Sequence, residues 1–360
     1  MNHLDIANAR LINQQITSSR FTSAKELVSW MGAMQAQDAA MVKWAVGIRL
    51  PQSTTQTIET ALDKGEIIRT HVLRPTWHLV PADELRWMLA LTAPHILAQT
   101  KSRQKELELS EAVLKKSMSI IEKILRDGNH LTREEIILEL NKGKIATDEN
   151  RASHIFVYAE LNLVICSGKA KAGKQTFALF EERIPKKKSI SREDMLAKLA
   201  KTYFTSHGPA TLQDFIWWSG LSVSQAKEGL ELAKTSLNSE ALESQTYWFG
   251  DSFTFPKSIE ASAYLLPAFD EFIISYKDRT ATLPITAHQQ AISSNGIFWP
   301  VIVVNGQAIG TWKRTIKKQK VIISLNFFKQ PDKKVRQSLE NAAGAFGKFL
   351  ELEPEIKLEE

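Results

Sequence analysis

The stretch FTSAKELVSWMG, residues 21–32, has the pattern of a capped helix. Ser23 and Glu26 stand three positions apart just before an apolar helical face, which is the spacing of a capping box. A corner and a second helical pattern follow, in AAMVKWAVGIRL (39–50). The same order recurs in LTREEIILELNKG (131–143) with ENRASHIFVYAELN (149–162), and in ATLQDFIWWSG (210–220) with SVSQAKEGLELA (222–233), where the capping pairs are Thr132 with Glu135 and Thr211 with Asp214.

A β-rich stretch follows each of the three helical pairs. A helical corner followed by a hairpin is the order of the winged-helix variant of the helix-turn-helix. The sequence therefore predicts three tandem winged-helix modules, over residues 1–110, 111–185 and 186–258. The expected hairpins are IIRTHVLRPTWHLV (67–80) with a turn at Arg74-Pro75, LVICSGKAKAGKQTFALF (163–180) with a Gly- and Lys-rich tip, and QTYWFGDSFTFP (245–256) with a turn at Gly250-Asp251.

The remainder of the chain, residues 259–360, changes character. Apolar runs separated by Gly and Asn turns predict a small antiparallel β-barrel, which the helix VRQSLENAAGAFGKFLELE (335–353) closes. The expected fold class is therefore α+β, with three winged-helix modules and a C-terminal barrel. Tandem winged helices bind DNA in some proteins and serve as protein-interaction scaffolds in others, and the repeat alone leaves both functions open.

The composition is that of a soluble globular protein, with 43% hydrophobic and 24% charged residues in a chain of 360. The single cysteine, Cys166, excludes an internal disulfide and fits a reducing compartment. The sequence has no apolar run of about 18 residues and no leader pattern, so we expect a cytoplasmic protein that does not bind membranes. It also lacks nucleotide-binding, zinc-hydrolase and metal-ligand patterns, and we expect neither a cofactor nor a metal.

Basic residues outnumber acidic ones by 46 to 40, and they are clustered. Clustered positive charge suits a polyanion such as DNA, although solvated surface lysines explain any one cluster taken alone. The helix expected in residues 39–50 is nearly all apolar, so we expect it to be buried and not to read a DNA groove. The predicted DNA contacts are Arg69 and Arg74 in the first hairpin, Arg151 at a helix start, Lys169, Lys171 and Lys174 in the second hairpin tip, and Lys313, Arg314 and Lys317 near the C-terminus.

Two glutamines stand in the first corner, in GAMQAQDAA, residues 32–40. On a helix residues i and i+2 point apart, whereas in an extended segment they point the same way. Gln35 and Gln37 can therefore act together only if the first helix ends near Met34 and the segment after it is extended. Asp38 is then suited to cap the next helix. The amides would also serve to bond unpaired backbone groups at the two helix ends, and the residues alone favour this simpler interpretation.

Five stretches together resemble the AlkZ-like DNA glycosylases, in the same order and over almost the whole chain. The resemblance implies tandem winged helices and a C-terminal β-barrel arranged as a C around DNA. It also implies that Gln35 and Gln37, which match the family's Gln-x-Gln motif, catalyse excision of bulky N7-alkylated purines and unhooking of interstrand crosslinks. The five stretches are residues 32–40, HVLRPTWHLV (71–80), HGPATLQDFIWWSGL (207–221), YLLPAFDEFIISYKDR (264–279) and GQAIGTWKR (306–314).

A pair of amides suits the chemistry that this resemblance implies. Hydrolysis of an N-glycosidic bond passes through an oxocarbenium-like state, and an N7-alkylpurine is already cationic, so it leaves without a general acid. What remains is to place a water and to favour positive charge on the sugar. The carboxylate of Asp270 would give such electrostatic support, and a buried Asp–Arg pair that holds the barrel is the alternative role for it.

We therefore expect a monofunctional DNA glycosylase that acts on double-stranded DNA with alkylated purines. We expect it to be cytoplasmic and nucleoid-associated and to need no obligate protein partner. The alternative function is that of a winged-helix DNA-binding protein without catalysis, either a regulator or a scaffold. A regulator has no need for a pair of amides in the corner before a buried helix, and this feature separates the two functions.

Overall fold

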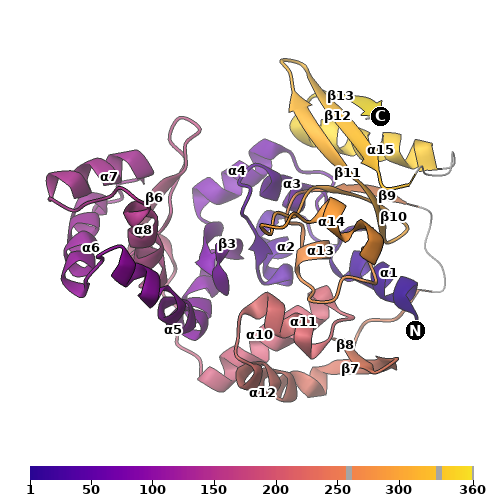
Figure 1. Cartoon of the computed structure of the whole chain (residues 1–360), viewed down its shortest axis with the longest axis horizontal. Helices are drawn as coiled ribbons and strands as arrows, with labels where there is room; N and C mark the ends of the chain where they lie inside the picture. The colour runs from indigo at the N-terminus through magenta and orange to yellow at the C-terminus, as the bar shows by residue number, and fades with distance from the viewer. Residues whose placement is uncertain (257–261, 330–334, 359–360) are drawn as a thin grey trace. The chain divides into compact units, whose positions relative to one another are not determined.

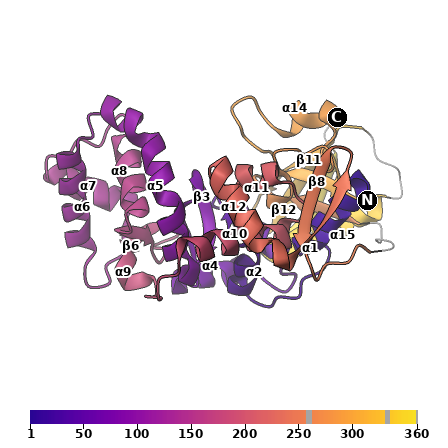
Figure 2. The same ribbon diagram turned by 90° about the horizontal axis from the view of Figure 1, so that it is seen from below.

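The computed structural model describes residues 1–256, 262–329 and 335–358 (Figure 1). The chain divides into two compact units. Unit 1 combines residues 1–59 with residues 196–360, and unit 2 is the continuous segment 60–195. Both units contain helices and sheet, which confirms the predicted α+β class (Figure 2). Within the described ranges, none of the helices combines the length and the apolar character that a membrane crossing requires.

Unit 1 contains the N-terminal helices, a helical group from the middle of the chain and the C-terminal sheet. Its helices are α1 (His3–Asn13), α2 (Ala24–Met31), α3 (Met41–Gly47), α11 (Leu212–Ser219), α12 (Val223–Ala233), α13 (Glu271–Ile274), α14 (His288–Ala291) and α15 (Arg336–Leu350), with 3-10 turns η1 (Lys234–Ser236) and η2 (Ile285–Ala287). Its strands are β1 (Met34–Gln35), β7 (Leu237–Leu242), β8 (Gln245–Gly250), β9 (Ala263–Leu266), β10 (Val301–Val304), β11 (Gln307–Ile316), β12 (Lys320–Phe327) and β13 (Glu353–Leu358). Helices α4 (Thr55–Lys64) and α10 (Arg192–His207) run across the unit boundaries.

Unit 2 is a hairpin followed by a helical group with a small sheet of its own. The three short strands of this sheet lie in the order β4-β6-β5, with α6 packed on β6 (Figure 1). Its core is formed by the apolar faces of α6, α7 and α8. The elements are β2 (Ile67–Val72), β3 (Arg74–Pro81), α5 (Ala82–Glu106), α6 (Glu111–Leu125), β4 (Leu131–Thr132), α7 (Arg133–Lys142), α8 (Arg151–Leu161), β5 (Ile165–Ser167), β6 (Thr176–Leu179) and α9 (Phe180–Arg183).

The three predicted capping boxes are all present. The Ser23 side chain accepts the backbone N–H of Glu26, whose carboxylate accepts the N–H of Ser23 in return. The same reciprocal pairs begin α7 and α11. Each box satisfies backbone donors that the first turn of a helix leaves without an internal partner, which explains why the helices begin where the sequence predicts.

Two predicted hairpin turns lie elsewhere in the structure. The first hairpin turns at Leu73, which has a φ of 63°, and not at Arg74-Pro75. This turn position requires a positive φ, which proline cannot adopt, and Pro75 lies instead inside β3. The third hairpin turns at Glu243, between β7 and β8, and not at Gly250-Asp251. Its first strand, LNSEAL, is half polar and mostly exposed, and its three polar residues are consecutive, so it lacks the apolar alternation by which strands are predicted.

The C-terminal sheet differs from the predicted antiparallel barrel. Its strand order is β13-β12-β11-β10-β9, with antiparallel pairing from β9 to β12 and parallel pairing between β12 and β13. Over the described residues the sheet is therefore mixed and open, and it is curled (Figure 1). The cause is Glu351, whose left-handed conformation ends α15 and returns the chain as an extra strand. Helix α15 supplies the crossover that a parallel neighbour requires.

The predicted module boundaries stay predictions, and the one at 258–259 touches residues outside the described ranges. Within 111–185 the elements follow in the order α6, β4, α7, α8, β5, β6 and α9, and within 186–258 in the order α10, α11, α12, η1, β7 and β8. An isolated bridge between Ala210 and Trp248 joins the start of α11 to the hairpin of the latter group.

Candidate active site around Gln35 and Gln37

The segment that contains Gln35 and Gln37 is not helical. Helix α2 ends at Met31, three residues earlier than expected, because Gly32 adopts a φ of 75°. A Cβ at Gly32 would lie 2.8 Å from the Thr202 side chain of α10, so glycine is also required by close packing. Met34 and Gln35 then form the extended strand β1, and α3 begins at residue 41. The helix is thus interrupted as a paired-amide site requires, but the extended strand includes Gln35 and not Gln37, which lies in a bend.

Asp38 lies just before α3, but the N-cap residue is Ala40 and not Asp38 as predicted. The Oδ1 atom of Asp38 accepts the backbone N–H groups of Ala40 and Met41, each at 2.9 Å. The carboxylate thus satisfies donors at the start of α3. Helix α3 itself is buried along nearly its whole length, which confirms that it does not present a surface for reading DNA.

The two glutamines differ in exposure. Gln35 is 6% exposed, whereas the Gln37 side chain is exposed to solvent. The backbone N–H of Gln35 donates to Oε1 of Glu271, the first residue of α13. Because Glu271 is buried, this hydrogen bond fixes the backbone of the segment to the interior of unit 1. Gln37, two residues on, lies where the segment reaches solvent.

Glu271 is surrounded by hydrogen-bond donors. Its Oε2 accepts the indole N–H of Trp218 at 3.2 Å and the hydroxyl of Ser275, and Nε2 of His207 lies at 3.4 Å. Burial by itself raises the pKa of this carboxyl group. His207, Ser275 and the Gln35 N–H outweigh that effect and hold the pKa at about 2. Glu271 is therefore ionised over the whole physiological range.

His207 is fully buried beside Glu271. Its ring stacks on Tyr203, with centroids 5.0 Å apart, and its Nδ1 atom lies 2.8 Å from the hydroxyl of Ser206. Burial lowers the pKa of His207, because an imidazolium loses its hydration in this position. Burial therefore favours the neutral ring at neutral pH, whereas at acid pH its protonated form contributes to the low pKa of Glu271.

Asp270, the neighbour of Glu271, is held by a buried arginine. Arg49 binds both carboxylate oxygens of Asp270, at 2.8 and 2.9 Å, and neither side chain is exposed. The remaining guanidinium donors bond to Ala45 O and to the backbone and side-chain oxygens of Gln14. Asp270 also accepts the N–H of Phe272 at the start of α13. Its charge is thus balanced within the fold, as in the ion-pair alternative for this residue.

The predicted DNA contacts in unit 1 lie on β11 and the turn that follows it. Lys313 and Lys317 are exposed. Arg314 is partly buried, with its guanidinium against the Met41 side chain, and burial lowers its pKa while the nearby Asp38 carboxylate raises it. Arg314 therefore places a cation close to the start of α3, next to the segment that contains the glutamines.

The predicted DNA contacts in unit 2 differ in how far other groups neutralise them. Arg151 bonds to Leu107 O, Asp148, Glu149 and Glu108, so its charge is balanced by three carboxylates. Arg69 lies over the Trp77 ring and donates to Gln175. In the hairpin tip Lys171 pairs with Glu135, and Lys169 and Lys174 are exposed, while Arg74 is partly exposed at the start of β3.

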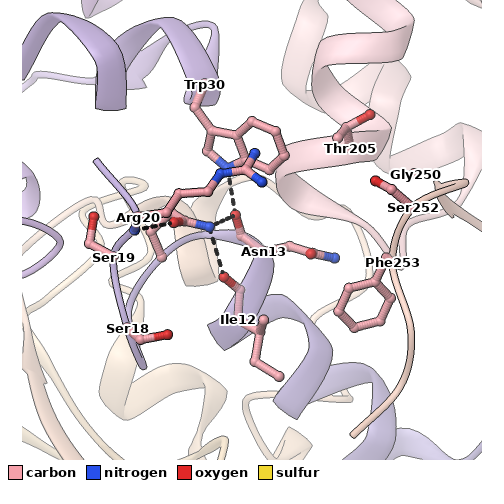
Figure 3. A pocket seen from close by; sticks show the side chains of 11 residues that line it. Ile12, Asn13, Ser18, Ser19, Arg20, Trp30, Thr205, Gly250, Ser252 and Phe253 are labelled. Carbon is pink, nitrogen blue, oxygen red and sulfur yellow. Dashed lines mark hydrogen bonds between the residues drawn. The ribbon is translucent and has the colours of Figure 1, made fainter. Parts of the chain in front are cut away.

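An open pocket of about 300 Å³ lies beside α2 (Figure 3). Its wall includes Trp30, whose indole N–H donates to Asn13 O at 2.7 Å, and the guanidinium of Arg20 lies 4.0 Å from the Trp30 ring centroid. Gln35 and Gln37 do not line this pocket. The pocket shares α2 with the candidate site but is separate from it.

The sequence interpretation missed the residues that hold Gln35. Glu271 stands beside Asp270 in a stretch that is otherwise apolar, and two acids in such a stretch signal buried, partnered carboxylates. His207 and Trp218 lie within the HGPATLQDFIWWSGL stretch, but nothing in their local pattern points to residue 35. The contact between Gln35 and Glu271 joins positions 236 residues apart.

Comparison with known proteins places the chain in a family. The family model described as "DNA glycosylase AlkZ-like" matches residues 28–349, which include the Gln35–Gln37 segment and Glu271. An interstrand DNA cross-link repair glycosylase from Streptomyces sahachiroi is 22% identical over 336 residues, which cover 84% of each chain. The solved structure of the Streptomyces sahachiroi DNA glycosylase AlkZ has the same fold, with a TM-score of 0.81 and 18% identity over 100% of both chains. The chain belongs to the AlkZ-like DNA glycosylase family.

Proposed function

We propose that this protein hydrolyses the N-glycosidic bond of N7-alkylated purines in double-stranded DNA, with the amides of Gln35 and Gln37 positioning the attacking water. The observation that carries the proposal is the non-helical segment between α2 and α3. One glutamine of this segment is fixed to the buried Glu271 and the other is exposed to solvent. A capping role alone does not require this arrangement, because Asp38 already satisfies donors at the start of α3.

The reaction needs no general acid and no cofactor. The oxygen of water bonds to C1′ of the deoxyribose, and the C1′–N9 bond breaks. The electron pair of that bond neutralises the positive charge of the N7-alkylpurine, which leaves as a neutral base. The water loses one proton to solvent, and an abasic site remains. An amide carbonyl can accept a hydrogen bond from the water and face the positive charge that develops on the sugar.

The substrates proposed include bulky adducts and interstrand crosslinks as well as methylated purines. One similar protein is named as an interstrand DNA cross-link repair glycosylase, and crosslink repair is a fitting role for this chain too. The exposure of Gln37 supports such a range, because a side chain at the surface can meet an adduct that a closed pocket would reject. We propose a monofunctional enzyme, since the described site offers amides and no amine nucleophile.

The DNA backbone would be bound by cations of both units. Lys313, Arg314 and Lys317 would supply phosphate contacts from β11 and its turn, with Arg69, Arg74, Lys169, Lys171 and Lys174 in unit 2. Arg151 is the weakest of the predicted contacts, because three carboxylates already surround it. The order of helices and hairpins in 111–185 and 186–258 supports winged-helix modules in both segments, and a third module in 1–110 completes the proposed architecture.

The test is an excision assay on duplex DNA that contains 7-methylguanine. The wild type, Gln35→Ala, Gln37→Ala and the double variant are compared with Gln213→Ala, which removes an exposed amide at the start of α11. We expect a loss of about 10² or more in single-turnover rate for the double variant and no loss for the control. Equal rates for the double variant and the wild type would refute the assignment of the site.

The same assay separates the enzyme from a DNA-binding protein without catalysis. Each variant is also tested for binding to undamaged duplex at a fixed salt concentration. If the wild type binds duplex but excises neither 7-methylguanine nor a bulky N7 adduct, the protein is a regulator or scaffold. If excision is present, abasic sites must accumulate without strand cleavage for the monofunctional assignment to hold.

A further inference from the structure

Among the described residues of unit 1, three carboxylates are buried in its interior, and two of them have an arginine of their own. Asp270 is bound by Arg49 through two hydrogen bonds. Asp214 lies 3.7 Å from Arg10, and its oxygens also accept backbone N–H groups. Glu271 is the third carboxylate, and its side chain is only 2% exposed.

Glu271 has neither an arginine nor a lysine as its partner among the described residues. The groups that face it are the backbone N–H of Gln35, the indole of Trp218, the hydroxyl of Ser275 and the ring of His207. The first three are neutral donors, and burial lowers the pKa of the His207 ring, which favours its neutral form at neutral pH. The two buried arginines are balanced by their own aspartates, so with His207 neutral the cluster has a net charge of −1.

An unneutralised buried carboxylate is costly to the fold. Transfer of a charge from water into a protein interior costs several kcal/mol even when hydrogen bonds compensate for part of its hydration. A structural role as acceptor for the Gln35 N–H does not need a charge, since a neutral carbonyl would also accept it. Buried groups of this kind occur preferentially at functional sites.

We propose that Glu271 is a positioning residue for the glycosylase reaction that also supplies a fixed negative potential at the Gln35–Gln37 segment. This inference rests on the proposed function. The carboxylate holds the backbone of Gln35 in place and favours the positive charge that develops on the deoxyribose as the C1′–N9 bond breaks. It takes no proton and forms no bond to the substrate. Glu271 would therefore stabilise the positive charge of the transition state, an effect that a residue with a purely structural role would not have.

The experiment compares binding of two abasic-site analogues in otherwise identical duplexes. One contains a pyrrolidine ring, which is protonated at neutral pH and mimics the positive charge on the sugar, and the other contains a neutral tetrahydrofuran ring. The wild type should bind the pyrrolidine duplex about tenfold more tightly. This is the size of one unit-charge interaction across roughly 10 Å at an effective dielectric constant of about 20.

Glu271→Gln should abolish most of this preference, whereas Glu271→Asp, which keeps the charge but shortens the side chain, should retain it. Glu231→Gln, which removes an exposed carboxylate on α12, serves as the matched control and should bind both duplexes as the wild type does. Single-turnover excision of 7-methylguanine should fall about tenfold or more in Glu271→Gln, with undamaged-duplex affinity unchanged.

The outcomes separate this inference from the proposed function. A wild type that excises 7-methylguanine but binds both analogues equally overturns the inference, even if no variant folds. Equal weakening of both analogues by Glu271→Gln also overturns it, because that result assigns Glu271 a structural role only. A wild type that does not excise any alkylated purine overturns the proposed function instead.

Discussion

Replacing Asp270 with alanine is expected to destabilise unit 1 by about 3–5 kcal/mol, because it leaves Arg49 charged and fully buried. Arg49 has five N–H donors, and Asp270 accepts two of them at 2.8 and 2.9 Å. The other three bond to Ala45 O and to two oxygens of Gln14, and these neutral acceptors carry no balancing charge. The substitution also removes the acceptor for the Phe272 N–H, which adds about 1 kcal/mol within that range.

The assay is differential scanning calorimetry of the wild type, Asp270→Ala, Arg49→Met and the double variant. For a cooperative unit of this size, a loss of 3–5 kcal/mol lowers Tm by about 6–20 °C. Either single variant leaves one buried charge without its partner, whereas the double variant removes both charges. The double variant should therefore be hardly less stable than either single variant, with a coupling energy of about 2 kcal/mol or more.

Strict additivity of the two single effects would refute the reasoning. So would a loss below about 1 kcal/mol in Asp270→Ala, which is the size of an exposed pair and not of a buried one. A matched exposed pair is formed by Glu231 on α12 and Lys234 at the start of η1, for which Glu231→Ala should lower stability by less than about 1 kcal/mol.

Three further results are expected. Folding lowers the pKa of Glu271 from 4.5 to about 2, so its ionised form stabilises the folded protein by about 3 kcal/mol. This stabilisation is complete above pH 4.5 and is lost as the pH falls toward 2. In urea unfolding, the difference in stability between the wild type and Glu271→Gln should therefore shrink as the pH is lowered from 4.5 to 2. Gly32→Ala should lower stability by about 1–3 kcal/mol and slow excision, because alanine disfavours a φ of 75° and its methyl group would contact Thr202 of α10. A variant with the Tm and the excision rate of the wild type would contradict this account. Lys313→Gln should reduce the slope of log Kobs against log salt for duplex binding by about 0.9, whereas Arg151→Gln should leave the slope unchanged because carboxylates already neutralise that guanidinium.

The sequence predicts well those features that depend on residues close in the chain. A capping box joins positions three apart, so Ser23 with Glu26 and Thr132 with Glu135 are visible as spacings and are present in the structure. The interruption of the helix before Gln35 is likewise a local consequence of Gly32. Apolar strands such as β10 are recognised by composition, while the half-polar β7 is not, because nothing in its pattern distinguishes it from a loop.

Features that depend on distant residues could not be predicted. The pairing of Arg49 with Asp270 joins positions 221 residues apart, and no spacing rule relates them. In the sequence, Asp270 and Glu271 are adjacent acidic residues, and no local pattern distinguishes their roles. They differ because Asp270 caps α13 and faces Arg49, whereas Glu271 is the first residue of α13 and faces Gln35. Only the packing of the fold therefore decides that Asp270, and not Glu271, has an arginine as its partner.

This difference bears on how the proposed enzyme would avoid undamaged DNA. An unmodified purine that left without protonation would carry a negative charge, whereas an N7-alkylpurine leaves as a neutral base. A fixed negative potential behind Gln35 would favour positive charge on the sugar for both the unmodified and the alkylated purine. It would also oppose the departure of the unmodified purine as an anion. Amides cannot donate a proton to relieve that anion, so they do not rescue the unmodified base. In the proposed enzyme, two amides backed by a buried carboxylate would thus favour the cationic lesion in two ways: they would stabilise positive charge on the sugar, and they could not protonate an unmodified base.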